Sequence, residues 1–140
     1  MPRTRMSIAE IDALIEAQFP AARGFCEIVE IRDDELDCVV RHRDAFLRPG
    51  GTVSGPTLMT LADTALYFLV LAMIGPQALA VTTSLSINFL RKPPPADLHA
   101  TARMLKLGAR LAVGEVHIRG GDDRALVAQA SVTYSIPPDS

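Results

Sequence analysis

Residues 58–74, LMTLADTALYFLVLAMI, form a long apolar run that predicts a helix. A helix that is apolar on every side is normally buried in a protein core. Asp63 interrupts this run, and it is the only charged residue between Arg48 and Arg91. Because burying a carboxylate without a partner is costly in free energy, Asp63 predicts either a specific structural partner or a chemical role.

The segment that leads into the run is rich in glycine, since residues 48–56 read RPGGTVSGP. Pro56 suits the first turn of a helix, where its missing N–H costs little, and Gly75-Pro76 stop the helix. The central helix is therefore predicted over 56–74. A buried acid together with the backbone N–H groups of a helix start indicates an acyl-transfer site.

The remaining chain predicts a sheet around this helix. A capping-box pattern from Ser7 to Glu10 predicts a short amphipathic helix over 7–19, packed outside as a lid or brace. Six segments have the composition and alternation of strands, and polar, Gly- or Pro-containing turns separate them. The sequence thus predicts one α+β domain over 1–140, a six-stranded and mainly antiparallel sheet wrapped around the central helix. The predicted strands are 25–31, 36–41, 79–91, 97–107, 110–119 and 124–136.

Composition excludes several classes of protein. A net charge of -2 gives no electrostatic case for binding nucleic acid. Only eleven uncharged residues follow Asp63 in the helix, whereas a membrane span needs about 20, so no membrane attachment is expected. Cys26 and Cys38 lack the spacing of a metal site or a CxxC motif, and no secretion signal is visible. We therefore expect reduced cysteines and a cytoplasmic protein.

Two stretches resemble the PaaI-like hotdog-fold acyl-CoA thioesterases. The first is GGTVSGP followed by LADTA, ending at Ala65, and the second is AVTT followed by INFLR, ending at Arg91. The resemblance covers roughly residues 45–136, and the order of the predicted strands agrees with it. It implies a homodimer or a homotetramer built as a dimer of dimers, with acyl-CoA sites at the subunit interface.

The resemblance also implies roles for individual residues. Asp63 matches the acid that acts as general base or nucleophile in the family. Gly55 matches the residue whose backbone N–H polarises the thioester carbonyl. Thr82 or Thr83 falls where a hydroxyl residue often holds the attacking water, and only one of them can face the site because they alternate on a strand.

Three positions depart from the family pattern. Ser54 stands where the family usually has His, Pro56 where it has a second Gly, and Arg48 where many relatives have Asn. Ser54 is a candidate substrate contact, and equally the N-cap of the helix. Arg48 is a candidate partner of Asp63 or of a phosphate group, and the sequence leaves both open. Because Pro56 has no N–H, Gly55 is the favoured oxyanion donor.

Further candidates would bind the substrate. Arg91-Lys92 is a basic pair at a strand end, suited to the phosphates of CoA, although a solvated strand end explains it equally well. Asn88 on the same strand is a further candidate, and Arg110 in a tight hairpin is a weaker one. The chemistry of thioester hydrolysis requires no metal and no cofactor beyond the CoA thioester itself.

Spacing predicts that two subunits share the site. Gly55 and Asp63 are eight residues apart, which is about 12 Å along a helix. A carboxylate two turns along cannot easily attack a carbonyl bound at the start of its own helix. A two-fold partner can bring the acid of one chain to the helix start of the other.

The leading hypothesis is hydrolysis of a small or medium acyl-CoA, with aromatic acyl groups included. A hotdog dehydratase would need a His paired with a carboxylate, and we expect the three histidines at surface or edge positions: His42, His99 and His117. A non-catalytic acyl-CoA-binding dimer is the other alternative, and Ser54, Pro56 and Arg48 are the features that favour it.

Overall fold

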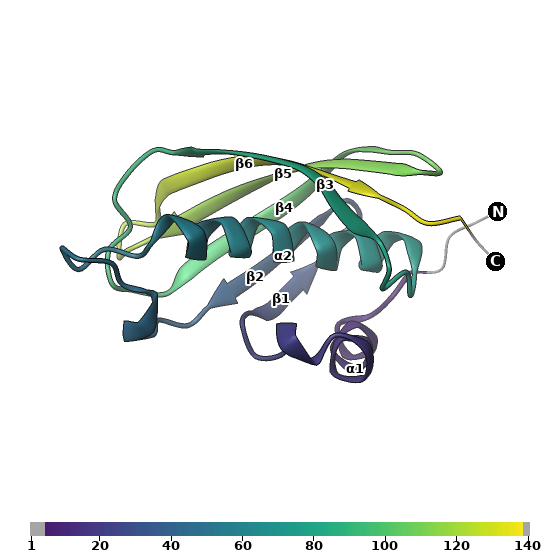
Figure 1. The fold of residues 1–140 in the computed structure, drawn as a ribbon, viewed down its shortest axis with the longest axis horizontal. Helices are drawn as coiled ribbons and strands as arrows, with labels where there is room; N and C mark the ends of the chain where they lie inside the picture. The colour runs from purple at the N-terminus through teal and green to yellow at the C-terminus, as the bar shows by residue number, and fades with distance from the viewer. Residues whose placement is uncertain (1–4, 139–140) are drawn as a thin grey trace.

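A computed structural model describes residues 5–138 of the chain. It contains one six-stranded sheet in the order β1-β2-β4-β5-β6-β3, in which every neighbouring pair is antiparallel. The sheet curves over the long helix α2, as Figure 1 shows. The strands are β1 (Glu27–Ile31), β2 (Glu35–Val40), β3 (Val81–Phe89), β4 (Leu98–Leu107), β5 (Leu111–Gly120) and β6 (Ala125–Ser135).

This architecture confirms the predicted α+β hotdog fold. Each predicted strand is present, with ends that differ from the prediction by at most two residues. The helix α2 runs from Gly55 to Ile74, one residue longer at its start than predicted. Its C-cap, Gly75, has a φ of 98°, a left-handed conformation that glycine adopts without strain.

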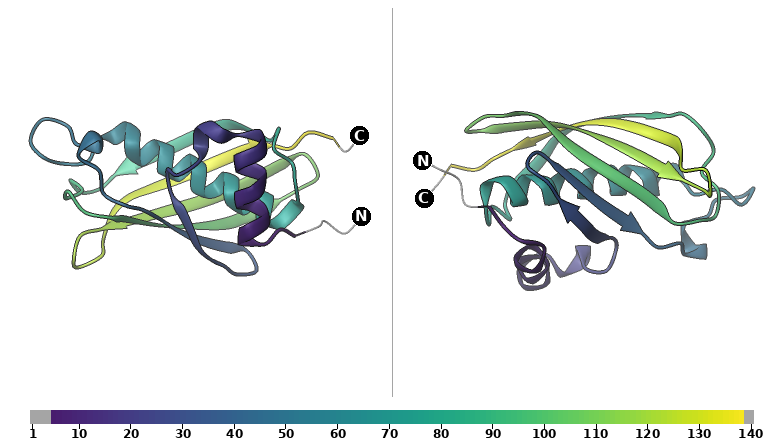
Figure 2. Two further views of the ribbon diagram at one scale, coloured as in Figure 1. Left: turned by 90° about the horizontal axis from the view of Figure 1, so that it is seen from below. Right: turned by 180° about the vertical axis from the view of Figure 1, so that it is seen from behind.

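The helix α1 (Ile8–Gln18) begins with the predicted capping box. The side chain of Ser7 accepts a hydrogen bond from the N–H of Glu10, and the Glu10 carboxylate accepts one from the N–H of Ser7. Ile11 and Ile15 are its buried residues. Figure 2 shows α1 crossing α2 on the side away from the sheet, the external brace that the sequence predicted.

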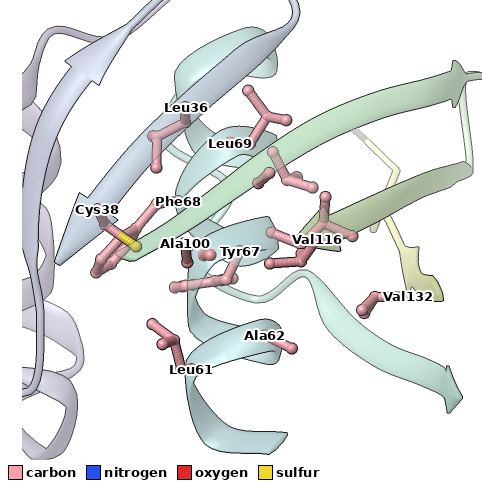
Figure 3. Close-up of a cluster of buried hydrophobic side chains, with 14 of the residues drawn as sticks. Leu36, Cys38, Leu61, Ala62, Tyr67, Phe68, Leu69, Ala100, Val116 and Val132 are labelled. Carbon is pink, nitrogen blue, oxygen red and sulfur yellow. The ribbon is translucent and has the colours of Figure 1, made fainter. Parts of the chain in front are cut away.

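The core lies between α2 and the concave face of the sheet. Figure 3 shows Leu61, Phe68 and Leu69 of α2 among side chains from β2, β4, β5 and β6. Each fully buried side chain of this kind stabilises the folded state by about 1.5–3 kcal/mol relative to leaving it exposed. Helix and sheet approach so closely at Gly114 on β5 that an added Cβ would lie 2.3 Å from a methyl carbon of Leu66.

By length and composition alone, α2 would pass as a membrane-spanning helix. In the structure its apolar side chains form the centre of the core cluster instead. Twelve of its twenty residues are buried, which explains why the run is apolar on nearly every side. The predicted core helix is confirmed.

The strand order leaves β1 and β3 at the two edges of the sheet. β3 pairs with β6 on one side only, and the register is shifted between Thr82 and Ser84. This irregularity, a β-bulge, changes which side chains of β3 face the helix. It lies next to Asp63 and therefore shapes the candidate site.

Candidate active site

Asp63 lies on the one stripe of α2 that is open to solvent. The stripe also contains Pro56, Met59 and Thr60, which are exposed and recur at helical spacing. Asp63 itself is only half-buried, and none of the described polar or charged residues is fully buried. The expectation of a buried carboxylate is therefore wrong for the single chain, because the sheet and α1 cover the other sides of the helix and leave this stripe uncovered.

Two hydroxyl groups hold the carboxylate of Asp63. Thr82 Oγ1 on β3 donates to Oδ1 at 2.6 Å, and Tyr134 Oη on β6 donates to the same oxygen at 2.6 Å. Tyr134 also donates to the main-chain carbonyl of Asp63 at 3.1 Å. Thr60 donates instead to the carbonyl of Pro56, so the partners of Asp63 come from the sheet and not from its own helix.

Tyr134 is the site residue that the sequence analysis missed. It is the register partner of Thr82 across the β3–β6 pair, so both side chains reach the same carboxylate. Burial and the hydrogen bond to Asp63 raise the pKa of Tyr134 above its usual value. Its position on the alternating strand was predictable, but only the pairing of β6 with β3 places its hydroxyl group next to Asp63.

Thr83 does not share this position. Its hydroxyl donates to the main-chain carbonyl of Thr133 on β6 at 3.3 Å. Because the register shift falls between Thr82 and Ser84, Thr83 is the extra residue of the bulge. Of the two candidate threonines, Thr82 alone contacts Asp63 within the chain.

A cavity of about 600 Å³ opens beside this carboxylate. Among the described residues, Asp63 is the only charged one that lines it, and the others are apolar, aromatic or hydroxyl-bearing. The rings of Tyr67 and Tyr134 stack in its wall with centroids 5.8 Å apart. Phe19 stands edge-on to Tyr67 at 6.1 Å, so the segment after α1 completes the wall. We call this cavity the acid pocket.

The start of α2 presents a single open backbone donor. The side chain of Ser54 is the N-cap and accepts a hydrogen bond from the N–H of Thr57 at 3.4 Å. Pro56 has no N–H, and the N–H of Leu58 donates to the carbonyl of Ser54. Among the described residues, the N–H of Gly55 has no hydrogen-bond acceptor. It is therefore the donor available to a bound carbonyl.

A second cavity, of about 470 Å³, adjoins Gly55. Arg48, Arg91 and Lys92 line it, together with the ring of Phe89, which lies over Gly55. The three cations form no ion pair with the described carboxylates. We call this cavity the basic pocket, and its charges suit phosphate groups.

Arg48 is held near the helix start by a tight turn. Its N–H donates to the carbonyl of Thr52, and the N–H of Gly51 donates to the carbonyl of Arg48. Gly50 and Gly51 have φ values of 100° and 78°, which favour glycine over other residues. Within one chain, Arg48 therefore lies in the basic pocket and does not pair with Asp63 in the acid pocket.

Other candidates lie outside both pockets. Asn88 donates to the side chain of Gln129 on the neighbouring strand at 3.0 Å. Arg110 lines neither cavity. The three histidines are half-buried, and none contacts Asp63 or lines either pocket: His42, His99 and His117. No group of three or more His, Cys, Asp or Glu residues in the described part of the chain could hold a metal ion.

The arrangement supplies two parts of an acyl-transfer site. An oriented carboxylate at an apolar cavity can accept a proton from water or attack a carbonyl. A free N–H at a helix start can stabilise the negative charge that develops on a carbonyl oxygen. The two parts line different pockets of the same chain.

Known proteins are similar to this chain in sequence and fold. A candidate thioesterase from Silicibacter sp. TM1040 is 43% identical and superposes with a TM-score of 0.86 over 95% of this chain and 93% of that chain. A candidate thioesterase from Ralstonia eutropha JMP134, described as phenylacetic acid degradation-related, is 29% identical with a TM-score of 0.77, over 86% of this chain and 93% of that one. A candidate esterase of Pseudomonas aeruginosa is 32% identical over 111 residues, 79% of this chain and 75% of the relative.

The match extends to the family level. Residues 50–127 match the family model of the thioesterase superfamily. This stretch begins at the glycine turn and includes the helix start, Asp63, Thr82 and the pair Arg91-Lys92. The family model, the sequence identities and the shared fold agree, and the chain belongs to the thioesterase superfamily.

Proposed function

We propose that this protein hydrolyses a small or medium acyl-CoA, aromatic acyl groups included, to the free acid and CoA. The observation that carries the proposal is the carboxylate of Asp63, which Thr82 and Tyr134 orient at the wall of an apolar cavity. Thioester hydrolysis in the family supports the reaction class. The acyl group, the CoA specificity and the residue roles are our proposals.

The acyl group would occupy the acid pocket. Its apolar and aromatic wall favours an uncharged acyl chain or ring, and Asp63 disfavours a substrate that carries a carboxylate there. The phosphates of CoA would lie in the basic pocket, where Arg48, Arg91 and Lys92 are without carboxylate partners among the described residues. The expected partner is therefore a small-molecule substrate. We expect no binding of nucleic acid, membrane or a cofactor.

The site would form between two subunits. The edge of β3 and its flanks expose apolar side chains, among them Leu79, Val81, Phe89 and Leu90, with exposed fractions of 78%, 56%, 52% and 52%. Exposed apolar residues on an unpaired strand edge favour association with a second copy. A two-fold axis beside β3 would bring Asp63 of one subunit towards Gly55 of the other. A homodimer, or a tetramer of two such dimers, would then be the active form.

The chemistry uses groups of both subunits. Asp63 takes a proton from water, and the resulting hydroxide attacks the thioester carbonyl carbon. Alternatively, the carboxylate attacks directly and forms an anhydride that water then cleaves. In either route the N–H of Gly55 of the partner subunit stabilises the oxyanion. Collapse of the tetrahedral intermediate breaks the C–S bond and releases CoA as a thiolate. In the water route the protonated Asp63 returns its proton to the thiolate as the free acid forms; in the direct route the thiolate takes a proton from solvent, and water then cleaves the anhydride to free acid and the Asp63 carboxylate.

A thiol-release assay tests the proposal. Short, medium, long and aryl acyl-CoAs are supplied to the wild type, and we expect release of CoA to be fastest with small, medium or aryl groups. Thr101→Val serves as a control protein, since Thr101 donates to Asp37 and neither residue lines either pocket. No release from any ester, with CoA esters still raising the melting temperature, would replace the proposal with a non-catalytic acyl-CoA-binding dimer.

A further inference from the structure

The hydroxyl group of Tyr134 joins the main chain of Asp63 to its side chain. It donates to the carbonyl oxygen of Asp63 at 3.1 Å and to carboxylate Oδ1 at 2.6 Å. One hydroxyl proton shared between two oxygens of a single residue fixes how the carboxylate is rotated relative to the helix. Thr82 adds a second donor to Oδ1 at 2.6 Å.

Both donors use the same oxygen, so the two oxygens of the carboxylate are different. Oδ2 accepts no hydrogen bond from the described residues. It is not a buried atom either, because the only buried side-chain polar atom without a partner in the described chain is Nδ1 of His42. Oδ2 is therefore accessible to solvent on a residue that lines the acid pocket, while Oδ1 accepts two hydrogen bonds.

The ring of Tyr134 is held rigidly enough to act as a support. Tyr134 is 3% exposed, and its ring stacks on Tyr67 at 27° between the planes. The hydroxyl of Tyr67 is itself fixed to the carbonyl of Ala78 at 2.8 Å. A packed aromatic ring has few alternative rotamers, so the direction of its hydroxyl is set by the sheet.

The protonation state of Tyr134 agrees with a donor role. Burial, and then the hydrogen bond to Asp63, raises the pKa of the phenol above its usual value. The group therefore stays protonated over the whole range in which an acyl-CoA is handled. It can orient the carboxylate without competing with it as a base.

We propose that Tyr134 is a positioning residue, which holds Asp63 so that Oδ2 is the oxygen that receives the proton of the attacking water or forms the bond to the carbonyl carbon. The inference rests on the proposed thioester hydrolysis. It also assigns different tasks to the two donors on Oδ1. Thr82 donates to Oδ1 alone, whereas Tyr134 also fixes the carboxylate to the backbone of α2.

The test is the variant Tyr134→Phe, which keeps the ring and its stacking and removes one oxygen. We expect kcat to fall about 10- to 100-fold, the range for a lost hydrogen bond to a charged group, while KM stays within a factor of two or so. In the background of Asp63→Asn, the same substitution should lower the residual rate no further. A residue that acts through Asp63 has nothing left to position there.

A matched control is Thr101→Val. Thr101 donates to the carboxylate of Asp37 at 2.8 Å, so this variant also loses a hydrogen bond from a hydroxyl to a carboxylate, but outside both pockets. It should lower the melting temperature and leave kcat unchanged. A purely structural role for Tyr134 would give the same pattern as this control, and that result would overturn the proposal.

A second measurement separates this inference from the proposed function. Urea unfolding of Tyr134→Phe, Asp63→Ala and the double variant reports whether the two residues are coupled, whether or not an ester is hydrolysed. Stability losses that do not add support the contact, and losses that add show that the hydroxyl does not hold Asp63. If the stability losses do not add but the wild type hydrolyses no ester, the contact between Tyr134 and Asp63 exists. In that case both the proposed hydrolysis and the positioning role of Tyr134 are wrong.

Discussion

The acid pocket and the basic pocket lie at different turns of the same helix and have opposite compositions. The acid pocket has one anion in an apolar and aromatic wall. The basic pocket has three cations around a helix start with one free N–H. The first suits an acyl group and a general base, and the second suits phosphates and an oxyanion.

Under the proposed mechanism, one subunit alone would be an incomplete catalyst. A base without an oxyanion donor cannot stabilise the charge that it helps to create, and a donor without a base leaves water as a weak nucleophile. Because Asp63 and the three cations line different pockets, they form no ion pair within the described chain. The proposed chemistry therefore requires a second subunit that brings the acid pocket of one chain to the basic pocket of the other.

The largest expected effect comes from removing the acid. Asp63→Asn should lower kcat by about 10²- to 10⁴-fold, the usual contribution of a general base. The basic pocket is untouched, so binding of CoA esters, measured by calorimetry, should persist. Full hydrolysis by Asp63→Asn would show that the acid pocket is not the site of chemistry.

A slightly smaller loss is expected from removing the oxyanion donor. Gly55→Pro deletes the free N–H at a helical position where proline is tolerated, and should cost about 10²- to 10³-fold in kcat. Circular dichroism checks that α2 is intact. An unchanged kcat would assign the oxyanion to another donor.

Mixing the two variants tests whether the pockets act across the interface. After unfolding and refolding together, Asp63→Asn and Gly55→Pro should recover about a quarter of the wild-type rate, because half of the dimers carry one intact site. Light scattering confirms that the mixture is oligomeric. If both groups acted within one subunit, the mixture would stay as inactive as its components.

The cations of the basic pocket should affect binding more than turnover. The double variant Arg91→Ala and Lys92→Ala should raise KM for acyl-CoA about 10-fold or more, since two charge-assisted contacts are lost. The wild-type KM should rise with ionic strength and that of the variant should rise less. Lys106→Ala is the control, because Lys106 is an exposed cation of β4 that lines neither pocket.

Gly114 provides a test of packing alone, because it lies against Leu66 of α2 and lines neither pocket. Gly114→Ala forces a Cβ to within 2.3 Å of Leu66 and should destabilise the fold by about 1–3 kcal/mol. Thermal unfolding measures the loss. A neutral result would mean that the side chain of Leu66 can move aside without cost.

The smallest effect is expected at the helix start. Ser54→Ala should cost about 1 kcal/mol of stability through the lost N-cap, and Ser54→Gly only a few tenths. Chemical denaturation compares the two. If Ser54 only caps the helix, neither variant should change KM for acyl-CoA. A raised KM in both variants, although Ser54→Gly keeps most of the stability, would show that Ser54 contacts the substrate.

Much of this molecule was predictable from local sequence. The capping box at Ser7, the N-cap at Ser54 and the glycine stop at Gly75 fix the helices because their causes lie within a few residues of each other. The alternation of apolar and polar residues predicted all six strands, and their ends differ from the prediction by at most two residues. Asp63 was predictable as a candidate site residue because a carboxylate within an apolar helix costs free energy unless it has a partner or a role.

The surroundings of Asp63 were not predictable in the same way. Its half-buried state depends on which stripe of α2 the sheet leaves uncovered, and its partner Tyr134 is 71 residues away in the chain. The choice of Thr82 over Thr83 depends on a bulge in the β3–β6 pair. These features arise from register between distant strands, about which alternation says nothing.

The sequence by itself therefore determined the elements, the fold class and the residues able to do chemistry, since propensity, capping and burial act over short distances. Tertiary structure decided which of them meet. It placed the hydroxyls of Thr82 and Tyr134 on one oxygen of Asp63, grouped Arg48 with Arg91 and Lys92, and kept the two groups apart. Distances between side chains from different strands are set by pairing and packing, and these are properties of the whole chain.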